Sequence, residues 1–127
     1  MLVSVAAGEV VREGFWSAFH AIAQVVQRDD TVVVFTSDHG DMCGSHGLRS
    51  KGPFVYDEIM RVPLYVKPAA SSPTAASAGS RSESLSSHVD LARTICGFAG
   101  VEPDDGMQGV DLGPLVADPK ATVRDHV

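Results

Sequence analysis

The segment FTSDHGDMCGSHGLRSKGPF, residues 35–54, holds the side chains of this chain that are best suited to chemistry. Asp38 and His39 are adjacent, and a carboxylate beside an imidazole at the end of a strand can hold a divalent cation. Gly40 allows a sharp backbone turn there. Lys51 could reach back to an anionic ligand as a compact positive charge. Taken alone, Asp-His-Gly favours a solvated loop, because short motifs also match by chance.

The elements before this segment would place it at the end of a buried strand. Residues 31–35 are a β-branched and aromatic run, which predicts a strand buried on both faces of a parallel or mixed sheet. Apolar residues recur in steps of three and four over residues 9–27, which predicts an amphipathic helix. Ligands of open α/β sheets bind beyond the carboxyl ends of the strands, so we expect the functional site here.

The rest of the chain predicts further elements of an α/β fold, with a mostly parallel or mixed sheet flanked by helices. Residues 62–66 form a second apolar run typical of a strand. The Ser- and Ala-rich residues 69–84 are predicted to be a flexible surface loop. A short helix is expected over residues 91–98 with Asp90 as its N-cap, and one more helical turn over residues 112–116.

Length and composition narrow the class of protein. A chain of 127 residues suits one modest domain, and 44% hydrophobic with 20% charged residues is typical of a globular protein. The net charge of −6 argues against nucleic acid as a partner, although a bound metal ion could still attract a small anion. Two cysteines provide no disulfide framework. We predict neither a signal peptide nor a membrane span, and the compartment stays undetermined.

An ordered set of motifs resembles the sulfatase family, within the alkaline-phosphatase superfamily. The set consists of an apolar strand leading into Ser37-Asp38-His39-Gly40, then Gly47-Leu48 with Ser50-Lys51-Gly52, then Tyr56 through Arg61-Val62-Pro63-Leu64. Residues 87–109, SHVDLARTICGFAGVEPDDGMQG, resemble the part that follows in the same family, which usually has Pro where this chain has Arg93. The resemblance covers nearly the whole chain, and the ordered set is far more specific than Asp-His-Gly alone.

The resemblance implies roles for individual residues. Asp38 and His39 would be metal ligands, and Lys51 would contact the sulfate or phosphate group of the substrate. His46 would either line the substrate pocket or pack the loop, with both alternatives open. The metal implied is Ca²⁺; Mn²⁺ and Zn²⁺ remain alternatives because an imidazole is a softer ligand than the oxygens that calcium prefers.

The resemblance also implies residues that this chain does not contain. The family's nucleophile is a formylglycine made from Cys or Ser in a C/S-x-P-x-R motif, and that motif is absent. Cys43 precedes Gly-Ser-His-Gly and is therefore not the nucleophile. We expect residues 1–127 to be a fragment of one sulfatase-like catalytic domain, part of an alkaline-phosphatase-like sandwich that is incomplete at both ends. Formylglycine is expected in the missing part.

Three functions follow as expectations. The first is metal-dependent hydrolysis of sulfuric esters, with a small anionic sulfate ester as substrate. The second is phosphodiester or phosphonate monoester hydrolysis, because the Asp-His pair also occurs in that part of the superfamily. The third, motivated by the missing nucleophile, is an inactive remnant or a weak binding module. An isolated chain of this kind is expected to be catalytically inactive.

Overall fold

The computed structural model describes residues 2–4, 29–77 and 79–126. The helix predicted over residues 9–27 lies outside these residues. The described elements, in chain order, are β1 (Leu2–Ser4), β2 (Val33–Thr36), η1 (Ser45–Gly47), α2 (Asp57–Met60), β3 (Pro63–Lys67), η2 (Pro73–Ser77), β4 (Arg81–Ser82), α3 (Asp90–Ala99) and α4 (Gly113–Ala117). Among the described helices, none is long and apolar enough to cross a membrane.

The strands form one mixed sheet in the order β2-β3-β1-β4. Strand β3 pairs in parallel with β1 and antiparallel with β2, where Thr36 faces Leu64. Both strands predicted around the polar segment are therefore present, each shifted by one or two residues. The prediction that the first is buried on both faces is wrong: all four residues of β2 are only half-buried. The β-branched residues of this run favour a strand even where the strand is only partly buried, so the run did not require burial on both faces.

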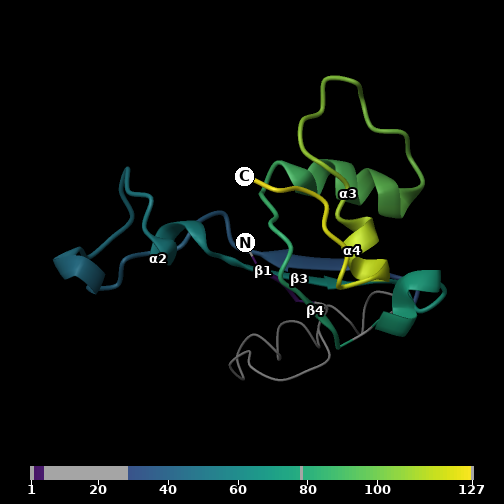
Figure 1. The fold of residues 1–127 in the computed structure, drawn as a ribbon, viewed down its shortest axis with the longest axis horizontal. Coiled ribbons are helices and arrows are strands. Elements are labelled where there is room, and N and C mark those ends of the chain that lie inside the picture. Colours follow the sequence, from purple (N-terminus) through teal and green to yellow (C-terminus); the bar gives the residue numbers. More distant parts are fainter. Residues whose placement is uncertain (1, 5–28, 78, 127) are drawn as a thin grey trace.

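Helices α3 and α4 lie on one face of the sheet (Figure 1), and the core lies between them and β3. Leu64 and Val66 alternate with more exposed neighbours along β3, as expected of a strand with one buried face. They form a buried cluster with Leu112, Leu115 and Val116, against which Leu91 and Phe98 of α3 pack. The helical turn expected over residues 112–116 is present as α4, which provides Leu115 and Val116 of this cluster, and Leu112 directly precedes it.

Helix α3 confirms the helix expected over residues 91–98 but corrects the role of Asp90. The helix begins at Asp90 itself and ends at Ala99, followed by Gly100, whose φ of 65° lies in the left-handed region. Asp90 is fully buried, and its side chain makes no capping bond within the helix. Its carboxylate instead accepts hydrogen bonds from the backbone N–H groups of Ser87 and Val110 and pairs with Arg124.

Residues 69–84 contain more regular structure than the predicted surface loop. They include the 3₁₀-helix η2 and strand β4, which pairs antiparallel with β1. Within this segment Ser82 is fully buried, although it is a small polar residue. Because strand β4 depends on its pairing with β1, the local composition of the segment gave no sign of it.

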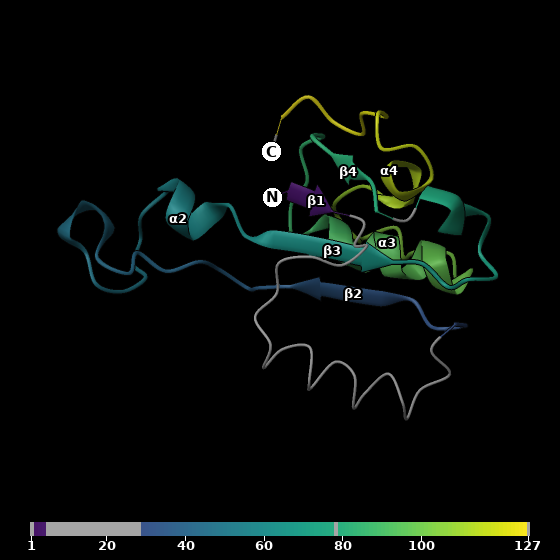
Figure 2. The ribbon, with the colours of Figure 1, turned by 90° about the horizontal axis from the view of Figure 1, so that it is seen from below.

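Residues 37–62, which we call the arm, connect β2 to β3 and project from the sheet (Figure 2). Helix α2 lies near the base of the arm and η1 at its far end, as both views show. The arm leaves β2 and returns into β3 at residues that face each other across the sheet. It holds every residue that the sequence singled out for chemistry.

Candidate metal centre

The base of the arm is fixed by hydrogen bonds that surround the end of β2. Thr36 Oγ1 donates to the carbonyl of Pro63 at 2.8 Å. Ser37 Oγ donates to the carbonyl of His39 at 2.7 Å. The imidazole Nε2 of His88 lies 2.6 Å from the carbonyl oxygen of Ser37 and must therefore donate to it. These bonds hold the backbone from which the side chains of Asp38 and His39 extend.

Gly40 allows helix α2 to lie directly against this segment. Its N–H donates to the carbonyl of Ile59 at 2.9 Å. A Cβ atom at this position would lie 1.8 Å from the carbonyl oxygen of Glu58, so no larger residue fits without movement of the backbone. The glycine that the sequence suggested for a sharp turn is thus required by a close approach between two backbone segments.

The structure brings three of the predicted site residues together at the imidazole of His39. Its Nδ1 lies 2.7 Å from the carbonyl oxygen of Gly40, its Nε2 lies 2.7 Å from Lys51 Nζ, and Asp38 Oδ2 is 3.6 Å from the same Nε2. A carbonyl only accepts hydrogen bonds, so we assign the proton to Nδ1. Nε2 then carries the lone pair and accepts from Lys51.

The carboxylate of Asp38 is held in its ionised form. The backbone N–H of His39 donates to Asp38 Oδ1 at 3.0 Å, and this bond lowers the pKa of Asp38 below its ordinary value. The nearby His39 side chain and, more weakly, the Lys51 ammonium lower the pKa further. Because Asp38 is exposed to solvent, it can reach a ligand without movement of the core.

Asp38 and His39 are chemically suited to share one divalent cation. Such ions lie about 2.0–2.6 Å from oxygen and nitrogen ligands, so one ion can contact two atoms that are 3.6 Å apart. The bond from His39 Nδ1 to a carbonyl is the usual way in which proteins orient a ligating imidazole. Over residues 2–4, 29–77 and 79–126, no group of three or more His, Cys, Asp or Glu side chains could hold a metal. The described residues therefore provide two candidate ligands for one ion, Asp38 and His39.

His46 lies with a different group of residues, at the far end of the arm. Its ring stacks on Tyr56 with centroids 4.3 Å apart, and its Nε2 is 3.6 Å from Glu58 Oε1. Glu58 also accepts a hydrogen bond from Ser45 Oγ, which lowers the pKa of the Glu58 carboxyl. The backbone of His46 is left-handed, with φ of 51°. These contacts favour the loop-packing alternative, because they hold a strained turn in place.

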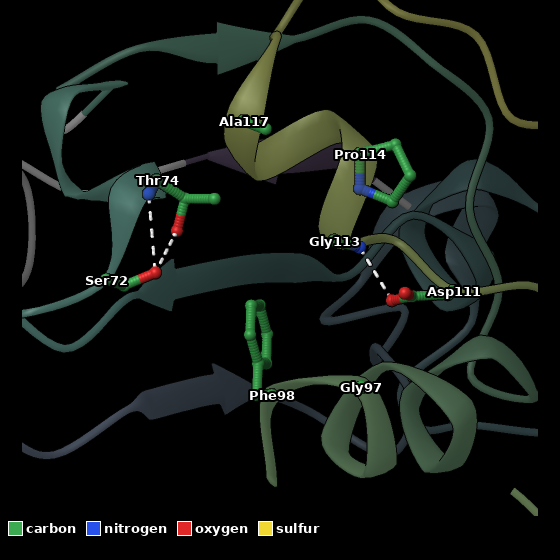
Figure 3. A pocket seen from close by; sticks show the side chains of 8 residues that line it. All are labelled: Ser72, Thr74, Gly97, Phe98, Asp111, Gly113, Pro114 and Ala117. Carbon is green, nitrogen blue, oxygen red and sulfur yellow. Dashed lines mark hydrogen bonds between the residues drawn. The ribbon is translucent and has the colours of Figure 1, made fainter. Parts of the chain in front are cut away.

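A separate pocket lies between η2, α4 and the end of α3 (Figure 3). Its volume is about 380 Å³, and it is lined by Ser72, Thr74, Gly97, Phe98, Asp111, Gly113, Pro114 and Ala117. Figures 1 and 2 place η2 at the opposite end of the sheet from the arm. The pocket therefore forms no part of the candidate metal centre.

Two contacts of the site region were missed by sequence reasoning. The structure shows the imidazole of His88 bound to Ser37, the residue before Asp38. The buried pair of Asp90 and Arg124 anchors the start of α3, just after His88. The one available signal was the short sequence His88-Val89-Asp90, which places two polar residues at the start of a helix.

Comparison with known proteins identifies the family. The family model described as Sulfatase matches residues 17–101, which is more than half of the chain and includes the whole arm and all of α3. This chain belongs to the sulfatase family. The sequence resemblance that rested on the arm and on residues 87–109 is thereby confirmed.

Relatives of this sulfatase-family chain are much longer than the chain itself. The N-acetylglucosamine-6-O-sulfatase of Bacteroides thetaiotaomicron is 36% identical over 115 residues, which cover 91% of this chain and 20% of the relative. The multifunctional alkaline phosphatase superfamily protein PehA of Trinickia caryophylli is 34% identical over 102 residues, or 80% of this chain and 19% of the relative.

A solved structure shows which fold the chain shares. BT4656 in complex with its substrate D-glucosamine-2-N,6-O-disulfate matches with a TM-score of 0.70 and 32% identity, over 89% of this chain and 22% of that one. The described residues therefore form part of a sulfatase fold. The chain spans about a fifth of the length of these relatives.

Proposed function

We propose that this chain supplies one side of the active site of a metal-dependent sulfuric ester hydrolase. Asp38 and His39 act as metal ligands, and Lys51 contacts the anionic ester. The observation that carries the proposal is the convergence of the three side chains at His39 Nε2, directly beyond the end of β2. Family membership supports the same chemistry, because the relatives named above include a sulfatase and a protein with a bound sulfated sugar.

Each residue has a distinct task in this function. A divalent cation, with Ca²⁺ preferred and Mn²⁺ or Zn²⁺ as alternatives, would polarise the ester oxygens and so ease attack at sulfur. The Gly40 carbonyl orients His39 so that Nε2 presents its lone pair. Asp38 remains ionised and neutralises part of the charge of the cation. Lys51, exposed on the arm, would stabilise negative charge on the ester as the bond to the leaving oxygen breaks.

The nucleophile of the reaction would come from residues outside this chain. Of the 127 residues, none forms the C/S-x-P-x-R motif from which the family makes formylglycine. We therefore expect the isolated chain to hydrolyse aryl sulfates no faster than buffer does. Metal-dependent turnover by the isolated chain that is lost on Lys51→Ala would contradict this expectation.

The test of the function uses a chimera, because the chain spans only a fifth of its relatives. The matching segment of the Bacteroides N-acetylglucosamine-6-O-sulfatase is replaced by this chain, and hydrolysis of an aryl sulfate is measured. In an active chimera, Asp38→Ala and Lys51→Ala should each lower kcat/KM by at least about a hundredfold, a loss typical of electrostatic active-site contacts. A matched control, Asp57→Ala, removes an exposed carboxylate of the arm that pairs with Arg61. Parental turnover with Asp38→Ala would refute the ligand assignment.

Phosphoester hydrolysis is the second candidate. It is favoured by the Asp38-His39 pair and by the 34% identity to PehA, a multifunctional alkaline phosphatase superfamily protein. The active chimera should be assayed on aryl sulfate, phosphate diester and phosphonate monoester substrates with the same leaving group. A higher kcat/KM for the sulfate supports the first function, and a higher value for either phosphorus ester supports the second.

A further inference from the structure

We propose that Lys51 and the divalent cation compete for His39 Nε2, so that metal binding releases Lys51 to the anionic ester. The inference rests on the proposed function and adds a coupling between metal binding at His39 and anion binding at Lys51. Lys51 Nζ lies 2.7 Å from His39 Nε2. That nitrogen is also the atom through which His39 would bind the metal, since Nδ1 is engaged by the Gly40 carbonyl.

The competition follows from the hydrogen-bonding capacity of the two groups. A neutral imidazole with its proton on Nδ1 has one lone pair, on Nε2. An ammonium carries three donors and no acceptor, so it cannot share that lone pair with a second cation. Two positive charges at one nitrogen would also repel each other at short range. Binding of a metal ion to His39 Nε2 therefore requires the Lys51–His39 hydrogen bond to break.

Lys51 can leave without disturbing the fold. Its side chain is exposed, and four flexible carbons separate the ammonium from the backbone. Its backbone lies in the arm between η1 and α2, away from the buried cluster of Leu64, Val66, Leu112, Leu115 and Val116. Once displaced, the ammonium has all three donors available for the oxygens of a sulfate group.

The coupling must act in both directions. If the metal frees Lys51 for the anion, then an anion that engages Lys51 frees His39 Nε2 for the metal. Linkage requires the two effects to have the same magnitude. Inorganic sulfate should therefore strengthen metal binding by the same factor by which the metal strengthens sulfate binding. This makes Lys51 a coupling residue as well as an anion contact.

The test uses the 127-residue chain, freed of metal with a chelator and titrated with Mn²⁺ while the free ion is measured by electron paramagnetic resonance. Wild type, Asp38→Ala and His39→Gln establish whether Mn²⁺ binds at the proposed site. Lys51→Met should then lower the Kd for Mn²⁺ by about three- to tenfold, the effect of removing one charge-assisted hydrogen bond. The control Arg49→Met removes the same charge from the arm and should have a smaller effect.

Two further readouts report Lys51 itself. Addition of Ca²⁺ should shift the NMR signal of the Lys51 ε-methylene group in wild type but not in Asp38→Ala. Sulfate should lower the Kd for Mn²⁺ in wild type and have little effect in Lys51→Met.

The failures of the two proposals are distinguishable. Equal Mn²⁺ affinity of wild type, Asp38→Ala and His39→Gln would refute the metal site and with it the proposed function. Mn²⁺ binding that requires Asp38 and His39, but with equal effects of Lys51→Met and Arg49→Met and an unmoved Lys51 signal, would overturn the coupling alone.

Discussion

The imidazole of His88 donates a hydrogen bond to the backbone carbonyl of Ser37, 51 residues earlier in the chain, at 2.6 Å. Ser37 immediately precedes Asp38, and His88 lies two residues before the start of α3. The contact thus ties the end of β2 to the start of the helix that covers the sheet. His88 does not need to touch a metal or a substrate to influence them, because it fixes the backbone that carries both candidate ligands.

A change at His88 should therefore weaken metal binding without removing a ligand. We expect His88→Ala to raise the Kd for Mn²⁺ by up to about tenfold, since groups that orient metal ligands have effects of this order. His88→Gln retains an N–H donor and should restore part of the affinity, which a purely steric role would not predict. His126→Ala serves as the control, because His126 is an exposed histidine. Unchanged affinity of His88→Ala would show that the hydrogen bond does not position the ligands.

A methyl group at residue 40 should be poorly tolerated. The Cβ of Gly40→Ala would lie 1.8 Å from the carbonyl oxygen of Glu58, a backbone atom that cannot move without shifting α2. We expect a loss of about 1–3 kcal/mol in the free energy of unfolding, measured by urea denaturation. Gly44→Ala adds a Cβ with no neighbour within 4 Å but at φ of 97°, so it tests backbone strain alone and should cost about 1 kcal/mol. A smaller loss for Gly40→Ala than for Gly44→Ala would contradict the steric argument.

The ionisation of Asp38 should depend on its neighbours. Its pKa is lowered mainly by the His39 N–H bond, so the pKa is lower in the folded chain than in the unfolded one. The stabilisation from this bond is fully present above the ordinary Asp value of 3.8 and is lost as the pH falls through the lower, folded value.

An NMR titration of the Asp38 carboxyl carbon would check that the pKa of Asp38 is lowered in the folded chain. The Asp38 pKa should lie below 3.8 in wild type and should rise slightly in Lys51→Met, because Lys51 makes only a minor contribution. A pKa above 3.8 in wild type would contradict the hydrogen-bonded geometry.

The buried pair of Asp90 and Arg124 should matter for stability more than any surface ion pair. Asp90 is 0% exposed, and its carboxylate also accepts the N–H groups of Ser87 and Val110. Removing one partner leaves the other, buried or mostly buried, without its counter-charge, so Asp90→Asn and Arg124→Met should each lower the free energy of unfolding by about 3–5 kcal/mol.

The double variant provides the test of coupling. Because it leaves neither charge unpaired, it should lose clearly less than the sum of the single variants. Arg61→Met, which breaks the exposed pair with Asp57, is the surface control and should cost less than about 1 kcal/mol. Additive losses from Asp90→Asn and Arg124→Met would show that the two side chains do not stabilise each other.

The parts of the fold with a regular local pattern could be predicted from the sequence. Apolar runs indicated β2 and β3, and the helix expected over residues 91–98 corresponds to α3. Strand β4 escaped notice because serine-rich residues carry little β propensity, and its existence depends on pairing with β1. The burial of Asp90 was missed for a related reason, since an aspartate before a helix normally caps it.

The candidate site was likewise predictable only in part. Asp38, His39 and Lys51 could be named from residue type and order along the arm. Their convergence on one imidazole nitrogen, and the bond from His88, depend on how distant segments pack. Such contacts carry no periodic signal in the sequence. His46 illustrates the limit, because residue type alone left two roles open, whereas its stacking on Tyr56 favours one of them.

The register between β2 and β3 has a consequence for how this region can be exchanged between proteins. Thr36 and Leu64 face each other across the sheet, so the intervening arm starts and finishes at neighbouring positions. A segment with this geometry can be lengthened, shortened or replaced while the two strands remain paired, because the entropy of closing a loop grows slowly with its length. The arm can therefore be exchanged as a single cassette that carries Asp38, His39 and Lys51 together, provided that the recipient also supplies the hydrogen bond that His88 makes to the Ser37 carbonyl.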